Sequence, residues 1–192
     1  MRTSSLIIGL AALLPLSQST ATPANKNGLV IKTTSGELHG FINSTTPSVR
    51  QFLGIRYAEP PVGALRFAPP KTKTKATGAI DATKFGASCM QQFSNGKTIY
   101  TEQVPQFLIN GGNSEDCLFL NVWAPVVKQK RDGYETKKGL PVLLYIPGGG
   151  FTGGGANSDY KLPHNWIQRT QSHIVVIMKY GSPSSQPIQD HN

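Results

Sequence analysis

The sequence predicts an α/β protein, and two continuous apolar runs in its second half are the main reason. The runs at 140–146 and 173–178 are typical of strands that a parallel sheet buries on both faces. The segment between them, 162–171, has the pattern of a helix, with Pro163 near its first turn, where proline is tolerated. A strand, a helix and a second strand form a βαβ unit, so we expect these two strands to be parallel.

Shorter strands are predicted upstream of this unit. Four strand-like runs occur between turn residues, at 29–34, 37–42, 49–57 and 118–123. Only Ser35 and Gly36 separate the first two runs, so we expect a hairpin there. The Pro-, Gly- and Lys-rich passage 60–78 and the charged stretch 128–139 are predicted to be loops. The predicted sheet therefore starts with antiparallel strands and ends with the parallel pair.

The first 21 residues have the features of a secretory signal peptide. Arg2 precedes the apolar stretch 6–16, and Ser19 and Ala21 form a small-x-small cleavage site. The stretch holds about eleven residues, whereas a membrane span needs about 20. A buried helix is the alternative, but nothing in the sequence caps one. We therefore expect residues 1–21 to be removed and the chain from residue 22 to be secreted, with no membrane span.

The chain contains two cysteines, Cys89 and Cys117. In an exported protein such a pair is more often a disulfide than two buried free thiols, which remain the alternative. Closing a loop of this size stabilises a fold by roughly 3–4 kcal/mol in the chain-entropy model. Asn43 opens the tripeptide Asn-Ser-Thr, which is an acceptor for N-glycosylation and also suits an exported chain.

The formal net charge of +9 raises the question of a nucleic-acid partner. The basic residues gather at 71–75 and 128–138, in polar, turn-like stretches. Solvated loops explain such clusters better than a nucleic-acid surface does. We therefore expect no nucleic-acid partner, and we expect neither a cofactor nor a metal site.

Six of the eight residues at 148–155 are glycine, and we call this stretch the glycine loop. It contains a Gly-x-Gly-x-x-Gly spacing, but a dinucleotide site needs a helix that begins at once and an acidic residue near the end of the next strand. A phosphate-binding loop needs Gly-Lys-Ser or Gly-Lys-Thr, whereas Gly155 precedes Ala156. Consecutive amides without Cβ atoms can instead surround a carbonyl oxygen that becomes negative during acyl transfer. The loop therefore predicts an oxyanion hole; a flexible linker is the alternative, although Phe151 is expected to hold the loop by packing.

The segment Glu115–Pro125, "EDCLFLNVWAP", carries the most specific resemblance to a known family. It is similar at every position to the second signature of the type-B carboxylesterase and cholinesterase-like lipase family of α/β-hydrolases. Three more stretches resemble blocks of that family in the same order: "FLGIRYAEPPVGALRFAPP", "ASCMQQ" and "YIPGGGFTGG". The resemblance extends from Leu29 to Val176 and covers the N-terminal part of the family's domain.

This resemblance implies an α/β-hydrolase fold of which residues 22–178 form the N-terminal part. The resemblance ends at Met178, because this chain has Lys-Tyr-Gly where the family usually has Asn-Tyr-Arg. The remaining stretch, 179–192, is interpreted as an atypical polar tail. A sheet that stops there leaves the strand at 140–146 with few neighbours, so we also expect poor solubility.

The resemblance also assigns roles to individual residues. The backbone amides of Gly149 and Gly150 match the donors of the family's oxyanion hole. Pro147 stands where many members have His or Tyr, which leaves the positioning of the loop open. Trp123 and Phe119 are expected in the core. Two further pairs are implied by the resemblance, a disulfide between Cys89 and Cys117 and a structural ion pair between Arg66 and Glu115.

The nucleophile of such hydrolases stands in a Gly-x-Ser-x-Gly elbow between a strand and a helix. The 192 residues contain no such pentapeptide, and the nearest match, Gly86–Met90, lacks the closing glycine. None of the histidines matches the family's catalytic position, so surface or capping roles are expected for all of them: His39, His164, His173 and His191. The catalytic serine, acid and histidine of the family are therefore absent from this sequence.

By resemblance, we expect a secreted carboxylic ester hydrolase that acts on an ester or lipid through a serine acyl-enzyme. We expect the chain as given to be inactive, because it lacks the nucleophile. The first alternative is a non-catalytic cholinesterase-like module used for adhesion. The second is a small secreted binding protein with a self-contained fold.

Overall fold

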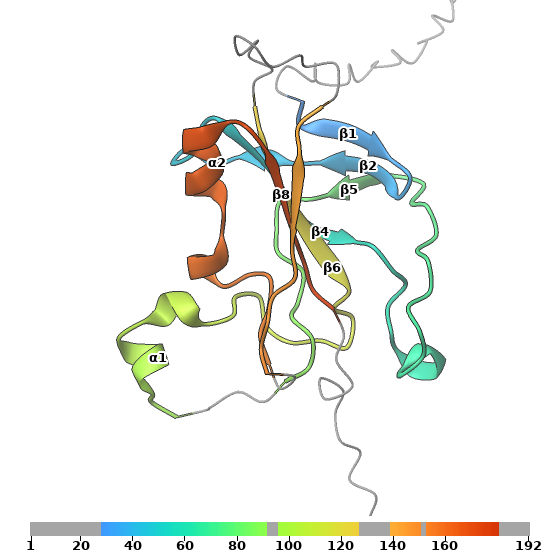
Figure 1. Ribbon diagram of the computed structural model, residues 1–192. Helices are drawn as coiled ribbons and strands as arrows, with labels where there is room; N and C mark the ends of the chain where they lie inside the picture. Colours follow the sequence, from blue (N-terminus) through green and yellow to red (C-terminus); the bar gives the residue numbers. More distant parts are fainter. Residues whose placement is uncertain (1–27, 92–95, 127–138, 151–152, 181–192) are drawn as a thin grey trace, which may run out of the picture.

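Two β-sheets and a few short helices form the computed structural model, which describes residues 28–91, 96–126, 139–150 and 153–180 (Figure 1). The strands are β1 (Val30–Thr33), β2 (Gly36–His39), β3 (Phe41–Ile42), β4 (Val49–Arg56), β5 (Ala79–Asp81), β6 (Phe119–Pro125), β7 (Val142–Tyr145) and β8 (Ile174–Met178). The helices are α1 (Ile99–Glu102) and α2 (His164–Thr170), with 3-10 turns η1 (Gly63–Leu65), η2 (Pro105–Phe107) and η4 (Asp159–Lys161). The predicted signal peptide at 1–21 and most of the predicted tail lie outside the described residues.

The larger sheet has the strand order β3-β4-β6-β8-β7, and the smaller sheet has the order β1-β2-β5. In the larger sheet β7 and β8 are parallel, and the other neighbours are antiparallel. The predicted parallel pair is therefore confirmed. The smaller sheet adds a parallel pair of β2 with β5 that the sequence did not predict. Helix α2 is shorter than the predicted 162–171, because Leu162 is the C-cap of η4, Pro163 is the N-cap of α2 and Gln171 is its C-cap.

The predicted hairpin is present, but its second strand ends earlier than predicted. β1 and β2 are antiparallel, with Thr33 opposite Gly36, and the chain then enters the larger sheet as β3. Gly40 marks the crossing, because a Cβ there would lie 2.6 Å from the Gln51 carbonyl oxygen and 2.6 Å from the Phe52 ring. The run 37–42 therefore serves two sheets, which corrects the prediction of one continuous strand.

A bulge at Gly54 lets β4 contribute to both faces of the larger sheet. The pairing of β4 with β6 shifts register between Phe52 and Ile55, and Gly54 has a φ of +64°. A Cβ on Gly54 would lie 2.5 Å from the Lys84 carbonyl oxygen, so the bulge requires glycine. In a regular strand Leu53 and Ile55 would point to the same face. Here they belong to two different cores.

Each face of the larger sheet carries its own hydrophobic core. On one face α2 packs through Ile167 against strand residues that are almost fully buried, namely Val49, Leu53, Trp123, Val175 and Ile177. On the other face the smaller sheet covers the second core, which contains Leu38, Phe52, Ile55 and Ala82. Figure 1 shows α2 and the smaller sheet on opposite sides of the larger sheet. Trp123 and Phe119 are buried, so their predicted place in the core is confirmed.

Strand β7 is exposed, which corrects the prediction that 140–146 is buried on both faces. All four residues of β7 are exposed, including Val142 at 60% and Leu144 at 53%. The strand lies at the edge of the larger sheet and pairs with β8 alone among the described strands. The apolar composition is therefore that of a buried strand, but no described element covers it.

Candidate active site

Two residues separate the end of β7 from the start of the glycine loop, at the carboxyl end of the parallel pair. The amide of Gly153 donates to the Gly149 carbonyl oxygen at 3.2 Å, and a Cβ on Gly149 would overlap the Gly153 carbonyl oxygen. Gly150 has a φ of +60° and Gly154 a φ of +113°, both in the region that favours glycine. The two described parts of the loop, 148–150 and 153–155, are therefore in direct contact. Phe151, predicted to hold it, lies outside the described residues.

A buried polar network supports the end of the glycine loop. Ser88 and Asn157 are both fully buried, and the Ser88 hydroxyl donates to Asn157 Oδ1 at 3.1 Å. A Cβ on Gly155 would lie 2.8 Å from each of these two oxygens, so the loop passes directly over them. Ser88 belongs to the nearest match to a nucleophile elbow. Because it is buried and bonded to Asn157, its role here is structural. Asn121 of β6 extends the network by donating to the Ala156 carbonyl oxygen at 3.2 Å.

Gln91 contacts the glycine loop directly, and sequence reasoning missed it. Its side-chain Nε2 donates to the Gly154 carbonyl oxygen at 3.0 Å, and its Oε1 accepts from the Gly154 amide at 2.8 Å. Gln91 follows Cys89 by two residues and lies 63 positions from Gly154. The resemblance of "ASCMQQ" to a family block was the only sequence signal near it.

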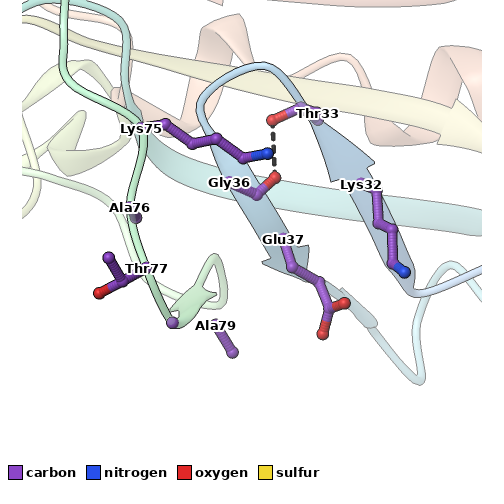
Figure 2. A pocket seen from close by; sticks show the side chains of 9 residues that line it. Lys32, Thr33, Gly36, Glu37, Lys75, Ala76, Thr77 and Ala79 are labelled. Atoms are coloured by element: carbon purple, nitrogen blue, oxygen red, sulfur yellow. Dashed lines mark hydrogen bonds between the residues drawn. The ribbon is translucent and has the colours of Figure 1, made fainter.

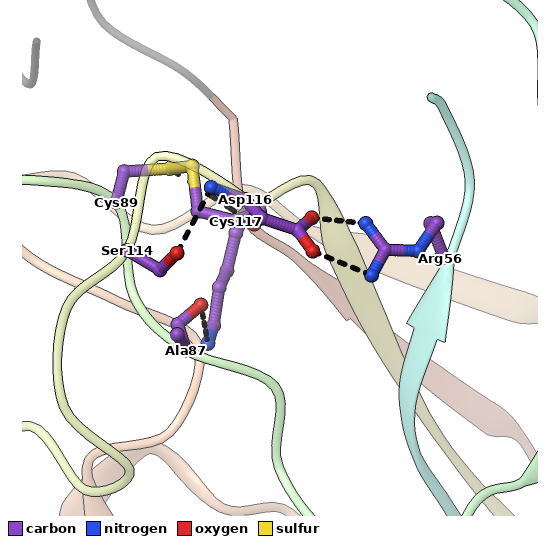
Figure 3. A network of polar contacts seen from close by, with 7 residues as sticks. Arg56, Ala87, Cys89, Ser114, Asp116 and Cys117 are labelled. Carbon is purple, nitrogen blue, oxygen red and sulfur yellow. Dashed lines mark hydrogen bonds and ion pairs between the residues drawn. A yellow bond between two sulfur atoms is a disulfide. The ribbon is translucent and has the colours of Figure 1, made fainter. Parts of the chain in front are cut away.

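Cys89 and Cys117 form a disulfide with an S–S distance of 2.06 Å. Figure 3 shows that this bond joins the segment after Ala87 to the segment just before β6. Beside it Asp116 forms two contacts with the Arg56 guanidinium, and the Asp116 amide donates to the Ser114 hydroxyl oxygen at 3.1 Å. The Arg56–Asp116 pair was not predicted, although Asp116 directly follows Glu115 of the predicted pair.

Arg66 and Glu115 form the ion pair that the resemblance implied. Both side chains are largely shielded, with 23% and 21% exposed. The pair connects the loop 60–78 to the segment that precedes β6, so it holds two segments of the chain together rather than lining the glycine loop. In the neighbouring Arg56–Asp116 pair, the Arg56 guanidinium lies 4.6 Å from the centre of the Phe119 ring and makes a cation–π contact with it.

Lys179 is a buried cation at the end of β8. Its side chain is held by carbonyl oxygens, with Nζ donating to Ala87 at 2.8 Å and also to Gly86. Only 3% of the residue is exposed, and this burial lowers the pKa of Lys179 to about 8. Lys179 therefore ties β8 to the segment that carries the disulfide.

The described histidines occupy separate places in the fold, and each is partly buried. His39 of β2 contacts Glu37 Oε1 at 2.8 Å. His164 begins α2, where burial lowers its pKa while Asp159 opposes the shift. The His173 ring lies 4.3 Å from the Trp166 ring before β8. His191 lies outside the described residues.

Asn43 is exposed in the turn between β3 and β4. Its Oδ1 accepts hydrogen bonds from the Thr45 amide at 3.0 Å and from the Thr45 hydroxyl at 2.9 Å. The acceptor tripeptide is thus presented at the surface.

A cavity of about 340 Å³ lies beside the β1–β2 hairpin (Figure 2). It is lined by the hairpin residues Lys32 and Glu37 and by the loop around Lys75 and Thr77. None of the predicted site residues lines it, so it does not belong to the candidate active site. The described part of the chain holds no group of three or more His, Cys, Asp or Glu residues arranged to bind a metal ion. No helix within it has the length and apolar character to cross a membrane.

The family follows from comparison with known proteins. Residues 27–182 match the Carboxylesterase family, and the chain belongs to this family of carboxylic ester hydrolases. The match covers the signature segment, the disulfide and the glycine loop. The resemblance inferred from the sequence is therefore confirmed.

Individual relatives agree with this assignment. The chain is 50% identical to a chlorogenic acid esterase from Aspergillus niger, over 92% of this chain and 35% of that protein. It is 34% identical to secreted lipase 5 from Gibberella zeae, over 94% of this chain and 35% of that protein. An acetylcholinesterase from Bungarus fasciatus is 32% identical over 82% of this chain and 25% of its own length. The chain thus spans about a third or less of these relatives.

Proposed function

We propose that this chain is the N-terminal part of a secreted carboxylic ester hydrolase with an α/β-hydrolase fold, and that Gly149 and Gly150 form its oxyanion hole. The observation that carries the proposal is the position of these two glycines. They lie a few residues after the parallel strand β7, at a point where Gly153 leaves no room for a Cβ on Gly149, in a chain that belongs to the Carboxylesterase family.

The proposed reaction is acyl transfer to a serine and then to water. The serine hydroxyl attacks the ester carbonyl and loses its proton to a histidine, and the histidine protonates the departing alcohol. Water then attacks the acyl-enzyme and releases the acid. In both steps the carbonyl oxygen becomes negative, and amides already aimed at it stabilise that charge. One such donor typically contributes about 10²–10³ in turnover.

The serine, its histidine and the orienting carboxylate must come from residues that this sequence does not contain. No Gly-x-Ser-x-Gly occurs in it, and Ser88 is buried against Asn157. We therefore propose that the 192-residue chain alone has no serine-dependent esterase activity. An organophosphate probe should leave the purified chain unlabelled, and stoichiometric labelling of a serine would contradict this.

The names of the relatives suggest which esters to test. One relative is a chlorogenic acid esterase and another is a secreted lipase. Chlorogenic acid is the first candidate because that relative is 50% identical over this region. The name of the secreted lipase and the disulfide support the proposed extracellular location. Glycosylation at the exposed Asn43 is proposed on the same grounds and predicts a mass loss in the N43Q variant.

A chimera tests the proposed function. Residues 27–182 replace the matching segment of the Aspergillus niger esterase, which supplies the missing serine, acid and histidine. We expect the folded chimera to hydrolyse chlorogenic acid. A chimera with a cooperative unfolding transition but no esterase activity would contradict the proposal and favour a non-catalytic module.

A further inference from the structure

The side chain of Gln91 binds the backbone of one residue of the glycine loop, Gly154, through both its amide and its carbonyl group. Its Nε2 donates to the Gly154 carbonyl oxygen at 3.0 Å, and its Oε1 accepts from the Gly154 amide at 2.8 Å. Nε2 also donates to the Cys89 carbonyl oxygen at 3.1 Å. A carboxamide is the side-chain group that supplies a donor and an acceptor side by side in this way.

Gln91 is itself held in place by its surroundings. Asn113 donates from Nδ2 to the Gln91 carbonyl oxygen at 3.1 Å. Two residues before Gln91, the disulfide joins Cys89 to Cys117. The Ser88 backbone is hydrogen-bonded to the segment next to Asn113, with its amide donating to the Gly112 carbonyl oxygen at 2.9 Å. The carboxamide therefore extends from a cross-linked support rather than from a free loop.

Gly154 passes this constraint to the proposed oxyanion donors. A Cβ on Gly154 would lie 2.8 Å from the Gly148 carbonyl oxygen, so the end of the loop packs against its beginning. The adjoining residue, Gly153, donates to the Gly149 carbonyl oxygen at 3.2 Å. Fixing Gly154 therefore constrains Gly148 and Gly149 at the other end of the loop.

We propose that Gln91 is a positioning residue that holds Gly154 against Gly148 and Gly149 and so helps to orient the amides of the proposed oxyanion hole. This inference rests on the proposed function and deepens it. A stretch with six glycines has many accessible conformations, and ordering it costs entropy. Oxyanion donors are effective only when they are aimed before the charge develops. The Gln91 carboxamide supplies that preorganisation from outside the loop.

Hydrogen exchange of the Gly154 amide tests the contact in the complete 192-residue chain. We expect this amide to be protected in the unaltered protein and to lose at least about tenfold of its protection in Q91L, which keeps the approximate size but removes both polar groups. Amides in the β6–β8 pairing serve as the internal reference for folding. Q106E is the matched control, because Gln106 is exposed within the same disulfide-closed loop.

The variant Q91E adds a pH readout that a general loss of packing would not produce. A neutral carboxyl can accept from the Gly154 amide and still donate to one carbonyl oxygen, whereas an ionised carboxylate only accepts and faces the Gly154 and Cys89 carbonyl oxygens. Protection of Gly154, corrected for intrinsic exchange, should therefore fall as pH rises through the pKa of the new carboxyl. In Q106E it should stay constant. Full protection in Q91L, or no pH dependence in Q91E, would overturn the proposal.

Kinetics in the chimera separate this proposal from the proposed function. Q91L should lower kcat by about tenfold to a hundredfold with little change in KM, because the donors act on the transition state. An inactive parent chimera would contradict the proposed function, while the exchange experiment would still decide the contact. An active parent whose Q91L variant keeps its kcat would overturn the positioning role alone.

Discussion

The Gly149 carbonyl oxygen accepts a hydrogen bond from the Gly153 amide at 3.2 Å, and a Cβ on Gly149 would overlap the Gly153 carbonyl oxygen. The adjacent Gly148 differs, because a Cβ there would meet no heavy atom within 4 Å. Two neighbouring glycines of the same triplet therefore have different structural demands. One is required by the turn itself, and the other leaves open space beside the strand end.

This difference predicts unequal effects of alanine at the two positions. G149A should destabilise the chain by about 1–3 kcal/mol, since the turn must open to admit the methyl group, whereas G148A should stay within about 0.5 kcal/mol of the unaltered protein. Urea unfolding measures both, and amide chemical shifts of 153–155 report the turn. Equal destabilisation by the two variants would contradict the described turn.

Local sequence patterns were sufficient for part of the fold. The two apolar runs and the helical segment between them predicted the parallel pairing of β7 with β8, because chain direction follows from a βαβ unit. The core positions of Trp123 and Phe119 also followed from the signature segment. The exposure of β7 could not be predicted in the same way, since burial depends on which elements cover a strand and not on its own composition.

The contacts that support the candidate site could not be predicted from local sequence patterns. The Gln91 contact joins residues 63 positions apart, and its geometry depends on where a disulfide and several irregular segments place one carboxamide. Gly40 and Gly54 likewise look like ordinary strand glycines in the sequence. Gly40 is required because strand β4 of the neighbouring sheet leaves no room for a Cβ, and Gly54 because the Lys84 carbonyl oxygen lies against it. Only the tertiary structure brings these groups close.

Arg56 should be more important for stability than an exposed ion pair. Its guanidinium makes two contacts with Asp116 and lies over the Phe119 ring, and lysine can reproduce neither the paired geometry nor the stacking. R56K should therefore cost about 1–2 kcal/mol of unfolding free energy. The control is K97M, which removes the exposed Lys97–Glu102 pair and should change stability by less than about 0.5 kcal/mol. A loss in R56K no larger than in K97M would contradict the assigned role.

Lys179 predicts that stability rises with pH in the mildly alkaline range. Its pKa is lowered to about 8 in the folded chain from a usual value of 10.5, because burial disfavours the charged form. Between these two values the unfolded chain binds more protons, so the free energy of unfolding increases as pH rises, by at most about 3 kcal/mol. Below pH 8 Lys179 is charged in both the folded and the unfolded chain, so the folded state carries the full cost of burying the charge and stability no longer changes with pH through this residue.

Urea unfolding between pH 7 and pH 10 measures this effect. Tyr57, whose pKa burial raises, acts in the opposite direction, but only above its ordinary value of 10.0. K179M should therefore abolish the increase between pH 8 and pH 10, whereas K84M, at an exposed lysine, should keep it. The same alkaline increase in K179M would show that another group is responsible.

The exposed edge strand predicts self-association of the 192-residue chain. Strand β7 presents apolar residues and one row of backbone groups at the edge of the larger sheet, and such an edge pairs readily with another chain. Lysine at an edge strand opposes this pairing, so L144K should lower the fraction of large species in sedimentation velocity. I99K is the matched control, because Ile99 is 64% exposed but lies on α1. If I99K restores the monomer as well as L144K does, general hydrophobicity and not the β7 edge drives the association.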